Sequence, residues 1–221
     1  MSEFISQYGS LILTAVGQTL LMVVLSTFFG YLLGIPLGVV AYVTDHGSIS
    51  ENRVINAIVG WVINIIRSVP FIILIIFLIP YTRAIMGTAS GTRGVIFPLV
   101  VGAAPFIARM VESSFNELDR GVIESARAMG ATNFQIIRKV LLPESFPSLL
   151  RGMSIATITL IGYIAMAGMV GGGGLGAVAI NYGYYRYERP VMNVTIVLLI
   201  LLVQAIQLLF SLIVRRVDKN K

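Results

Sequence analysis

Six consecutive positions near residue 171 carry a pattern that is typical of nucleotide binding. Gly171, Gly173 and Gly176 in "GGGGLG" match G-x-G-x-x-G. In a dinucleotide-binding protein this pattern follows a β-strand and opens a helix, so that backbone N–H groups hold phosphates. Here it follows a long apolar stretch, and no G-x-x-x-x-G-K-[ST] phosphate loop exists in the chain. We therefore expect a flexible hinge, or close packing, and no nucleotide site. The candidate hinge residues are Gly171, Gly172, Gly173 and Gly174.

Side chains that carry metal or covalent chemistry are nearly missing. The chain has no cysteine and one histidine, His46. This excludes disulfides, a zinc–cysteine site and a thiol nucleophile, and one histidine does not make a metal site. His46 stands in the polar sequence "TDHGS", where a solvated loop residue is expected. No paired carboxylates or Ser/His/Asp set occurs in the apolar segments. The sequence therefore gives little support for an enzyme and implies no cofactor.

The composition indicates a membrane protein. Of the 221 residues, 57% are hydrophobic and 12% are charged, against roughly 25% charged in a soluble domain. The mean hydropathy is +0.89. Several apolar runs reach the roughly 18 residues that mark a membrane span. The sequence predicts one all-α domain over residues 1–221, a polytopic helix bundle of the inner-membrane type. In such a protein the net charge of +6 indicates topology and lipid contact, not nucleic-acid binding.

Five membrane-spanning helices are predicted, over residues 11–43, 55–79, 95–111, 149–170 and 191–214. The first contains Gly30, Gly34 and Gly38, which lie on one helical face and allow another helix backbone to approach closely. The second is interrupted by "RSVP", and Pro70 should kink or break the helix because it lacks a backbone donor.

The distribution of basic residues predicts the orientation. Five spans place the two ends of the chain on opposite sides of the membrane. With the N-terminus outside, the cytoplasmic segments 44–54, 112–148 and 215–221 hold nine Lys and Arg, and the outer loops hold four. Because cytoplasmic loops carry the excess of positive charge, the N-terminus is predicted outside and the C-terminus in the cytoplasm. Residues 171–174 then lie on the outer side.

Charged residues inside the spans need partners or water. Arg67 lies in the second span, where an arginine costs roughly 2.5–3.5 kcal/mol on insertion scales. Arg67, with Ser68 and Pro70, is expected either to line a pathway or to pair with carbonyls freed near the proline. Arg109 and Glu112, three residues apart at the inner end of the third span, are expected to pair on one helical face.

The fourth span contains a second group of candidate pathway residues. Tyr163, Met166 and Met169 lie just before the glycines. A polarizable thioether is a suitable lining for an apolar thioether ligand, although methionine also fills cores. Both readings stay open, and no dense polar site appears in the spans.

Residues 119–143 form a polar segment between two apolar runs, and they are predicted to fold as two short helices. Asp119 caps the first, which extends to about Met129, and Gly130 stands where a helix end needs a left-handed residue. Thr132 with Gln135 forms a capping box for the second helix. That helix is predicted to end before Pro143, because the residue before a proline avoids helical geometry.

Each of the two helices is amphipathic. The predicted apolar stripes are Val122, Ile123, Ala126 and Met129 on the first helix, and Phe134, Ile137, Val140 and Leu141 on the second. Such helices either lie on the membrane surface or pack under the bundle and present a rigid knob to a cytoplasmic partner.

The same segment resembles the EAA loop of ABC importer permeases, whose pattern is E-A-A, three residues, G, nine residues, I, one residue, L-P. Ser125 replaces the middle alanine and Val140 replaces the isoleucine. The resemblance implies that this loop docks into a groove of an ATPase subunit. The coupling residues it implies are Glu124, Ser125, Ala126, Gly130, Ala131, Val140, Leu142 and Pro143.

The resemblance extends over nearly the whole chain. The sequences "RSVPFIILIIFLIPYTR", "VGAAPFIARMVE", "GYIAMAGMVGGGGLG" and "NYGYYRY" are similar to those of methionine-uptake permeases, type I importers with five spans per subunit. This implies a homodimer in a bacterial inner membrane, two copies of an ABC ATPase, and an external lipid-anchored substrate-binding protein. It also implies alternating access with methionine, L- or D-, as substrate.

Other functions remain open on sequence alone. One alternative keeps the class of protein and changes the substrate to another small amino acid or a methionine derivative. The other changes the class, to a passive channel or a membrane assembly factor that uses residues 120–141 as a surface anchor. Co-purification with an ATPase separates these classes.

Overall fold

The computed structural model describes residues 2–217, which form helices joined by short connections, without a β-strand in that range. The all-α prediction is confirmed. The α-helices are α1 (Ser2–Val43), α2 (Arg53–Ser68), α3 (Phe71–Phe77), α4 (Ile79–Met86), α5 (Gly91–Asn116), α6 (Arg120–Ala128), α7 (Asn133–Ile136), α8 (Leu142–Glu144), α9 (Phe146–Ala167), α10 (Gly174–Val178) and α11 (Arg189–Val217). Two π-helical turns, η1 (Ile137–Leu141) and η3 (Ala179–Tyr184), and one 3-10 turn, η2 (Gly168–Val170), lie between them.

Four helical stretches in the described range are long and apolar enough to cross a membrane: Glu3–Val43, Gly91–Asn116, Phe146–Val170 and Arg189–Val217. The pair α2 and α3 passes the same test together, but its two helices are bent by 102°. A fifth span exists if this bent pair counts as one crossing. Helices α1 and α5, which contain the first and third predicted spans, begin before residues 11 and 95, because the polar turns that precede these spans are also helical.

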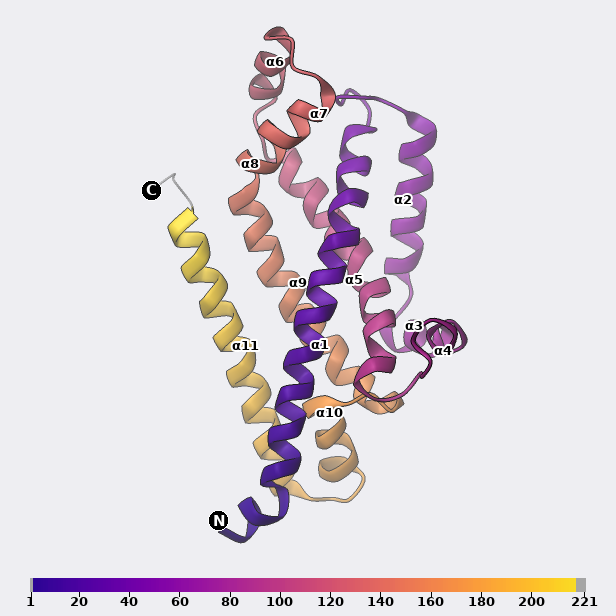
Figure 1. Cartoon of the computed structure of the whole chain (residues 1–221), viewed down its shortest axis with the longest axis vertical. Helices are drawn as coiled ribbons and strands as arrows, with labels where there is room; N and C mark the ends of the chain where they lie inside the picture. Colours follow the sequence, from indigo (N-terminus) through magenta and orange to yellow (C-terminus); the bar gives the residue numbers. More distant parts are fainter. Residues whose placement is uncertain (1, 218–221) are drawn as a thin grey trace.

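The break between α2 and α3 lies at Val69 and Pro70, where the sequence predicted it. Val69 is extended, with φ −82° and ψ 124°, as expected for a residue that precedes a proline. Asn52 caps the other end of α2, and its side chain accepts hydrogen bonds from Val54 N and Ile55 N. The break turns α3 away from the direction of α2, so that α3 and α4 lie at the side of the bundle (Figure 1).

The glycines of α1 lie against α5, as expected for a close backbone approach. A Cβ added at Gly34 would lie 2.6 Å from Ile107 Cγ2, and one added at Gly38 would lie 2.5 Å from the carbonyl oxygen of Ala108. Because any side chain at these positions would separate the helices, the glycines determine the α1–α5 distance.

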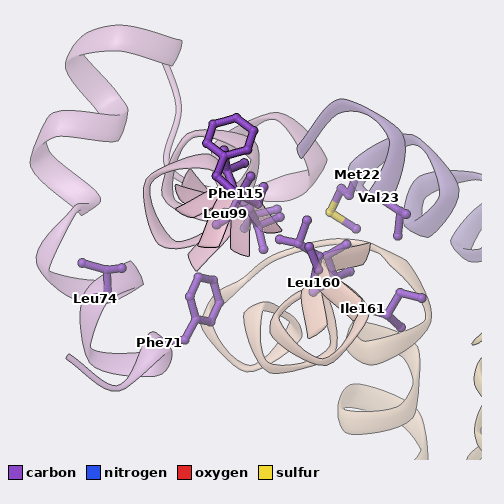
Figure 2. Close-up of a cluster of buried hydrophobic side chains, with 14 of the residues drawn as sticks. Met22, Val23, Phe71, Leu74, Leu99, Phe115, Leu160 and Ile161 are labelled. Atoms are coloured by element: carbon purple, nitrogen blue, oxygen red, sulfur yellow. The ribbon is translucent and has the colours of Figure 1, made fainter. Parts of the chain in front are cut away.

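The core lies between α1, α3, α5 and α9. Figure 2 shows Leu99 and Phe115 on α5, Leu160 on α9, Met22 on α1 and Phe71 on α3, all members of one buried cluster. In the most apolar 18-residue stretch of α5, 67% of the residues are buried, whereas in that of α11 the share is 0%. Helix α5 is therefore the central helix, and α11 lies at the periphery (Figure 1).

The two ends of the bundle carry different small helices. Helix α6 lies at one end, while α10 lies at the other, where α1 begins (Figure 1). The segments between the predicted spans, residues 80–94 and 171–190, are not simple loops, because they contain α4, α10 and η3. These helices are too short for their periodicity to be recognised in the sequence.

Candidate functional site

The first helix of the polar segment has the ends that the sequence predicted. The Asp119 side chain accepts a hydrogen bond of 2.8 Å from Gly121 N. At the other end Gly130 has φ +81°, and Ala131 N donates to the carbonyl of Ala126 at 3.1 Å. Local groups therefore satisfy both ends of α6.

The capping box of the second helix is also confirmed. Thr132 Oγ1 accepts from Gln135 N at 3.3 Å, and Gln135 Oε1 accepts from Thr132 N at 2.8 Å. The predicted end of this helix before Pro143 is wrong. The chain continues from α7 through the π turn η1 into α8, which contains Pro143. Because Leu142 N donates to Ile137 O, five residues back, the wider π turn allows the chain to pass through a proline that offers no donor.

The apolar residues of the segment divide into two sets. Ile123 and Ala126 on α6 are buried with Ile136 and Leu141. The stripe prediction is wrong for three residues, since the exposed fractions are 44% for Val122, 81% for Met129 and 68% for Phe134. Met129 and Phe134 lie on either side of the turn at Gly130, where the helix periodicity that predicted the stripes ends, and Val122 lies at the edge of the buried face of α6. The segment therefore packs on the bundle and leaves three apolar side chains exposed.

The eight residues of the EAA-like pattern divide in the same way. Ala126 is buried, and Ala131, Val140 and Leu142 are partly buried. Four residues are exposed: Glu124, Ser125, Gly130 and Pro143. The first set joins the segment to the bundle and the second is available to a partner.

A basic residue of the segment, Arg127, connects it to the loop between α1 and α2. Arg127 Nη2 donates to the carbonyl of Ile49 at 2.7 Å and lies 3.4 Å from the carbonyl of Ser48. No sequence signal could have identified this contact, because the acceptors are backbone atoms 78 and 79 residues away.

The broken helix lines a cavity of about 160 Å³. Arg67 and Tyr163 both line it, and the Tyr163 ring stacks on Phe71 with centroids 4.3 Å apart and planes at 4°. Two candidate groups from distant segments thus meet here. The Arg67 side chain makes no hydrogen bond or ion pair with the described residues, so the expected alternative of pairing to freed carbonyls is not found.

The other candidate pathway residues do not line this cavity. Ser68 is exposed, and its hydroxyl donates to the Asn64 carbonyl at 2.7 Å. Pro70 forms the break itself. Met166 and Met169 have exposed fractions of 46% and 58%. In this chain alone the methionines therefore face outward, and their role as pathway residues stays a prediction.

The predicted pair of Arg109 and Glu112 on α5 is confirmed. Arg109 Nη1 donates to Glu112 Oε2 at 2.7 Å, and Arg109 Nη2 donates to Asn64 Oδ1 at 3.0 Å. Because Asn64 belongs to α2, this arginine connects α2 to the central helix.

The glycines at 171–174 are closely packed, which is one of the two expected alternatives. Gly174 N donates to Gln18 Oε1 at 2.8 Å and Leu175 N donates to Thr19 Oγ1 at 2.9 Å. A Cβ at Gly173 would lie 2.7 Å from Gln18 Oε1, and one at Gly172 would lie 2.6 Å from the carbonyl oxygen of Ala167. Hinge motion of these glycines stays a prediction.

The chain belongs to the family of binding-protein-dependent transport system inner membrane components, whose model matches residues 34–220. It is 50% identical to a probable D-methionine transport system permease protein of Vibrio cholerae, over 99% of this chain and 97% of that one. A D-methionine transport system permease protein of Escherichia coli is 52% identical over 72% of this chain and 73% of its own length.

Solved structures agree with this assignment. A chain of the inward-facing MetNI methionine ABC transporter superposes with a TM-score of 0.95 at 50% identity, covering 96% of this chain and 99% of that one. A chain of an amino acid ABC transporter has a TM-score of 0.78 at 21% identity, which shows the shared fold alone. The protein is thus a permease subunit of an ABC transporter, a multi-pass inner-membrane component.

Proposed function

We propose that this chain is the permease of a methionine importer that carries L- and D-methionine into a bacterial cell. The observation that carries the proposal is the 50% identity to D-methionine permeases and to the methionine transporter chain, extending over at least 96% of this chain. The broken helix, its cavity and the EAA-like segment all lie within this similarity.

The proposed assembly contains two copies of this chain, two ABC ATPase subunits that hydrolyse ATP, and an external lipid-anchored substrate-binding protein. The N-terminus lies outside and the C-terminus in the cytoplasm. Two observations support this arrangement: the basic residues concentrate at the end that carries α6, and the segment around α6 and α7 exposes the apolar side chains of Val122, Met129 and Phe134. An ATPase groove is the partner that the EAA-like pattern implies.

The proposed mechanism is alternating access. ATP binding draws the ATPase subunits together and moves both copies of residues 119–143, the coupling segment. Because both ends of α6 are capped and Ile123 and Ala126 are buried in the core, the segment moves with the bundle helices. The cavity at Arg67 and Tyr163 then changes its access from one side to the other. The candidate pathway residues, among them Arg67 and Tyr163, position a substrate that the binding protein selects.

The experiment measures uptake of labelled L-methionine, and in parallel D-methionine, by cells that lack their own methionine importers. The cells receive this chain with its ATPase and binding protein, and control cells receive no ATPase. A pull-down on this chain verifies assembly. ATP-dependent uptake of both isomers is expected. An assembled complex without methionine uptake would remove the substrate from the proposal, and absence of the ATPase from the pull-down would remove the coupling role.

A further inference from the structure

The connection between α1 and α2 is a well-ordered loop. Within residues 44–52, Ser50 N donates to Val43 O at 2.9 Å and Asn52 N donates to Thr44 O at 3.0 Å. The Glu51 carboxylate accepts from Gly47 N at 3.0 Å and contacts His46 Nδ1 at 2.9 Å. These two hydrogen bonds lower the pKa of Glu51 to about 2, so the carboxylate stays ionised and keeps the loop in shape.

This loop contacts the coupling segment at one main place. The guanidinium of Arg127 on α6 donates to the Ile49 carbonyl at 2.7 Å, a charge-assisted hydrogen bond to backbone. The Ile49 side chain is 8% exposed and belongs to the same buried cluster as Ile123 and Ala126 of α6.

Beside this contact the two surfaces separate. A cavity of about 150 Å³ lies between them, lined by Asp45 and His46 of the loop and by Arg120 and Glu124 of α6. The Arg127 bond and the buried Ile49 therefore form a localised connection, and removal of the guanidinium would leave open space that no neighbouring side chain fills.

The loop is in turn fixed to α2. Asn52 caps α2, and Asn56 Nδ2 of its first turn donates to the Ala41 carbonyl of α1 at 2.8 Å. The far end of α2 is the break at Pro70 and the cavity that Arg67 lines. A continuous set of rigid contacts thus runs from α6 through the loop to the cavity, without passing through α5 or α9.

We propose that Arg127 is a positioning residue through which the coupling segment moves α2. This inference deepens the proposed function, on which it rests. Helices α5 and α9 are joined to the coupling segment by the chain itself, whereas α2 is joined to it by the Arg127–Ile49 contact and the loop. Helix α2 also packs on α5, through the hydrogen bond from Arg109 to Asn64 and the buried Ile63. Arg127 therefore sets how much of the segment's movement reaches the first turns of α2 directly, in addition to the part that α5 transmits.

The test uses the reconstituted complex in proteoliposomes and compares Arg127→Met with the unmodified chain. Arg127→Met keeps a long side chain but removes every donor. We expect about fivefold fewer substrate molecules transported per ATP hydrolysed, within the range of residues that connect two sites, with assembly unchanged. Arg127→Lys retains a cationic donor and should recover about half of the loss. The matched control is Arg53→Met, which removes a cation beside the same loop, where Arg53 only contacts Glu51 at 3.3 Å.

A second measurement follows the movement itself. Since the chain has no cysteine, spin labels at Ile58→Cys on α2 and, separately, at Ile155→Cys on α9 report distances between the two copies; both side chains are more than half exposed. On ATP binding, Arg127→Met should lose part of the distance change at 58, because α5 still holds α2 at Asn64, and should keep that at 155. An equal change at both positions, or unaltered coupling, would overturn the inference.

Two further outcomes are distinguishable. Should Arg127→Met fail to insert, Arg127→Lys carries the same test, with an expected deficit of about twofold. Should the unmodified complex transport no methionine, the proposed substrate fails, but the ATP-driven movement of α2 still tests Arg127 because it requires only the ATPase.

Discussion

Two of the left-handed glycines that lie beside short helices are at opposite ends of the bundle. Gly130 follows α6 with φ +81°, and Gly174 opens α10 with φ +84°. The backbone conformation is nearly the same, but the surroundings differ. A Cβ at Gly130 would meet nothing within 4 Å, whereas one at Gly174 would lie 2.5 Å from Thr19 Oγ1.

The hydrogen bonds at the two turns differ in the same way. The groups that cap α6 and α7, Asp119 and Thr132, are within three residues of their partners. The groups that cap α10, Gln18 and Thr19, belong to α1 and are 156 residues away. The coupling segment therefore keeps its shape by local bonds, as the proposed lever requires, while the turn at Gly174 depends on the packed bundle.

The largest expected effect is that of Gly130→Pro. Proline requires φ near −65°, which the turn at +81° does not allow, and it removes the N–H that donates to Arg127 O at 2.9 Å. We expect uptake to fall to the background of cells without the ATPase, with membrane insertion intact. Gly130→Asn is the control and should keep most of the uptake, because asparagine tolerates the left-handed region. Normal uptake by Gly130→Pro would contradict the lever.

The second prediction separates the cost of a left-handed backbone conformation from the cost of overpacking. Alanine at Gly130 should lower the free energy of unfolding by about 1 kcal/mol through its left-handed conformation alone. Alanine at Gly174 adds overpacking against Thr19 and should cost about 3 kcal/mol in total. Thermal unfolding of the two purified variants in the same detergent measures the difference. Equal stabilities would show that the packed site relaxes and that the contrast between the turns is smaller than the distances indicate.

The smallest expected effect is that of Gln18→Ala. It leaves Gly174 N without its acceptor, which should weaken the start of α10 by about 1 kcal/mol. Hydrogen exchange should increase at residues 174–178 and stay unchanged in α6. Gln7→Ala, at an exposed position of the same helix, is the control and should change neither region. Faster exchange in α6 would show that the two ends are coupled through α1.

Much of the coupling segment could be predicted because its determinants are local. The Asp119 cap, the Gly130 turn and the Thr132–Gln135 box each involve residues at most five apart, so the order of the side chains decides the geometry. The break at Pro70 follows from a missing donor in the same way. The end of α7 was misjudged because the π turn before Pro143 is an adjustment of the backbone that no residue type indicates.

The amino-acid sequence by itself determined the membrane class, the α-helical fold, the glycine face of α1 and the ends of α6. These depend on composition, periodicity and short spacings. Only the tertiary structure decided that Arg127 reaches the Ile49 carbonyl, that Gln18 caps α10 and that Arg67 meets Tyr163 at one cavity. The physical reason is that two of these contacts end on backbone atoms and all join segments at least 78 residues apart. Backbone acceptors and donors are the same at every position, so only the packing of the helices selects which one a side chain meets.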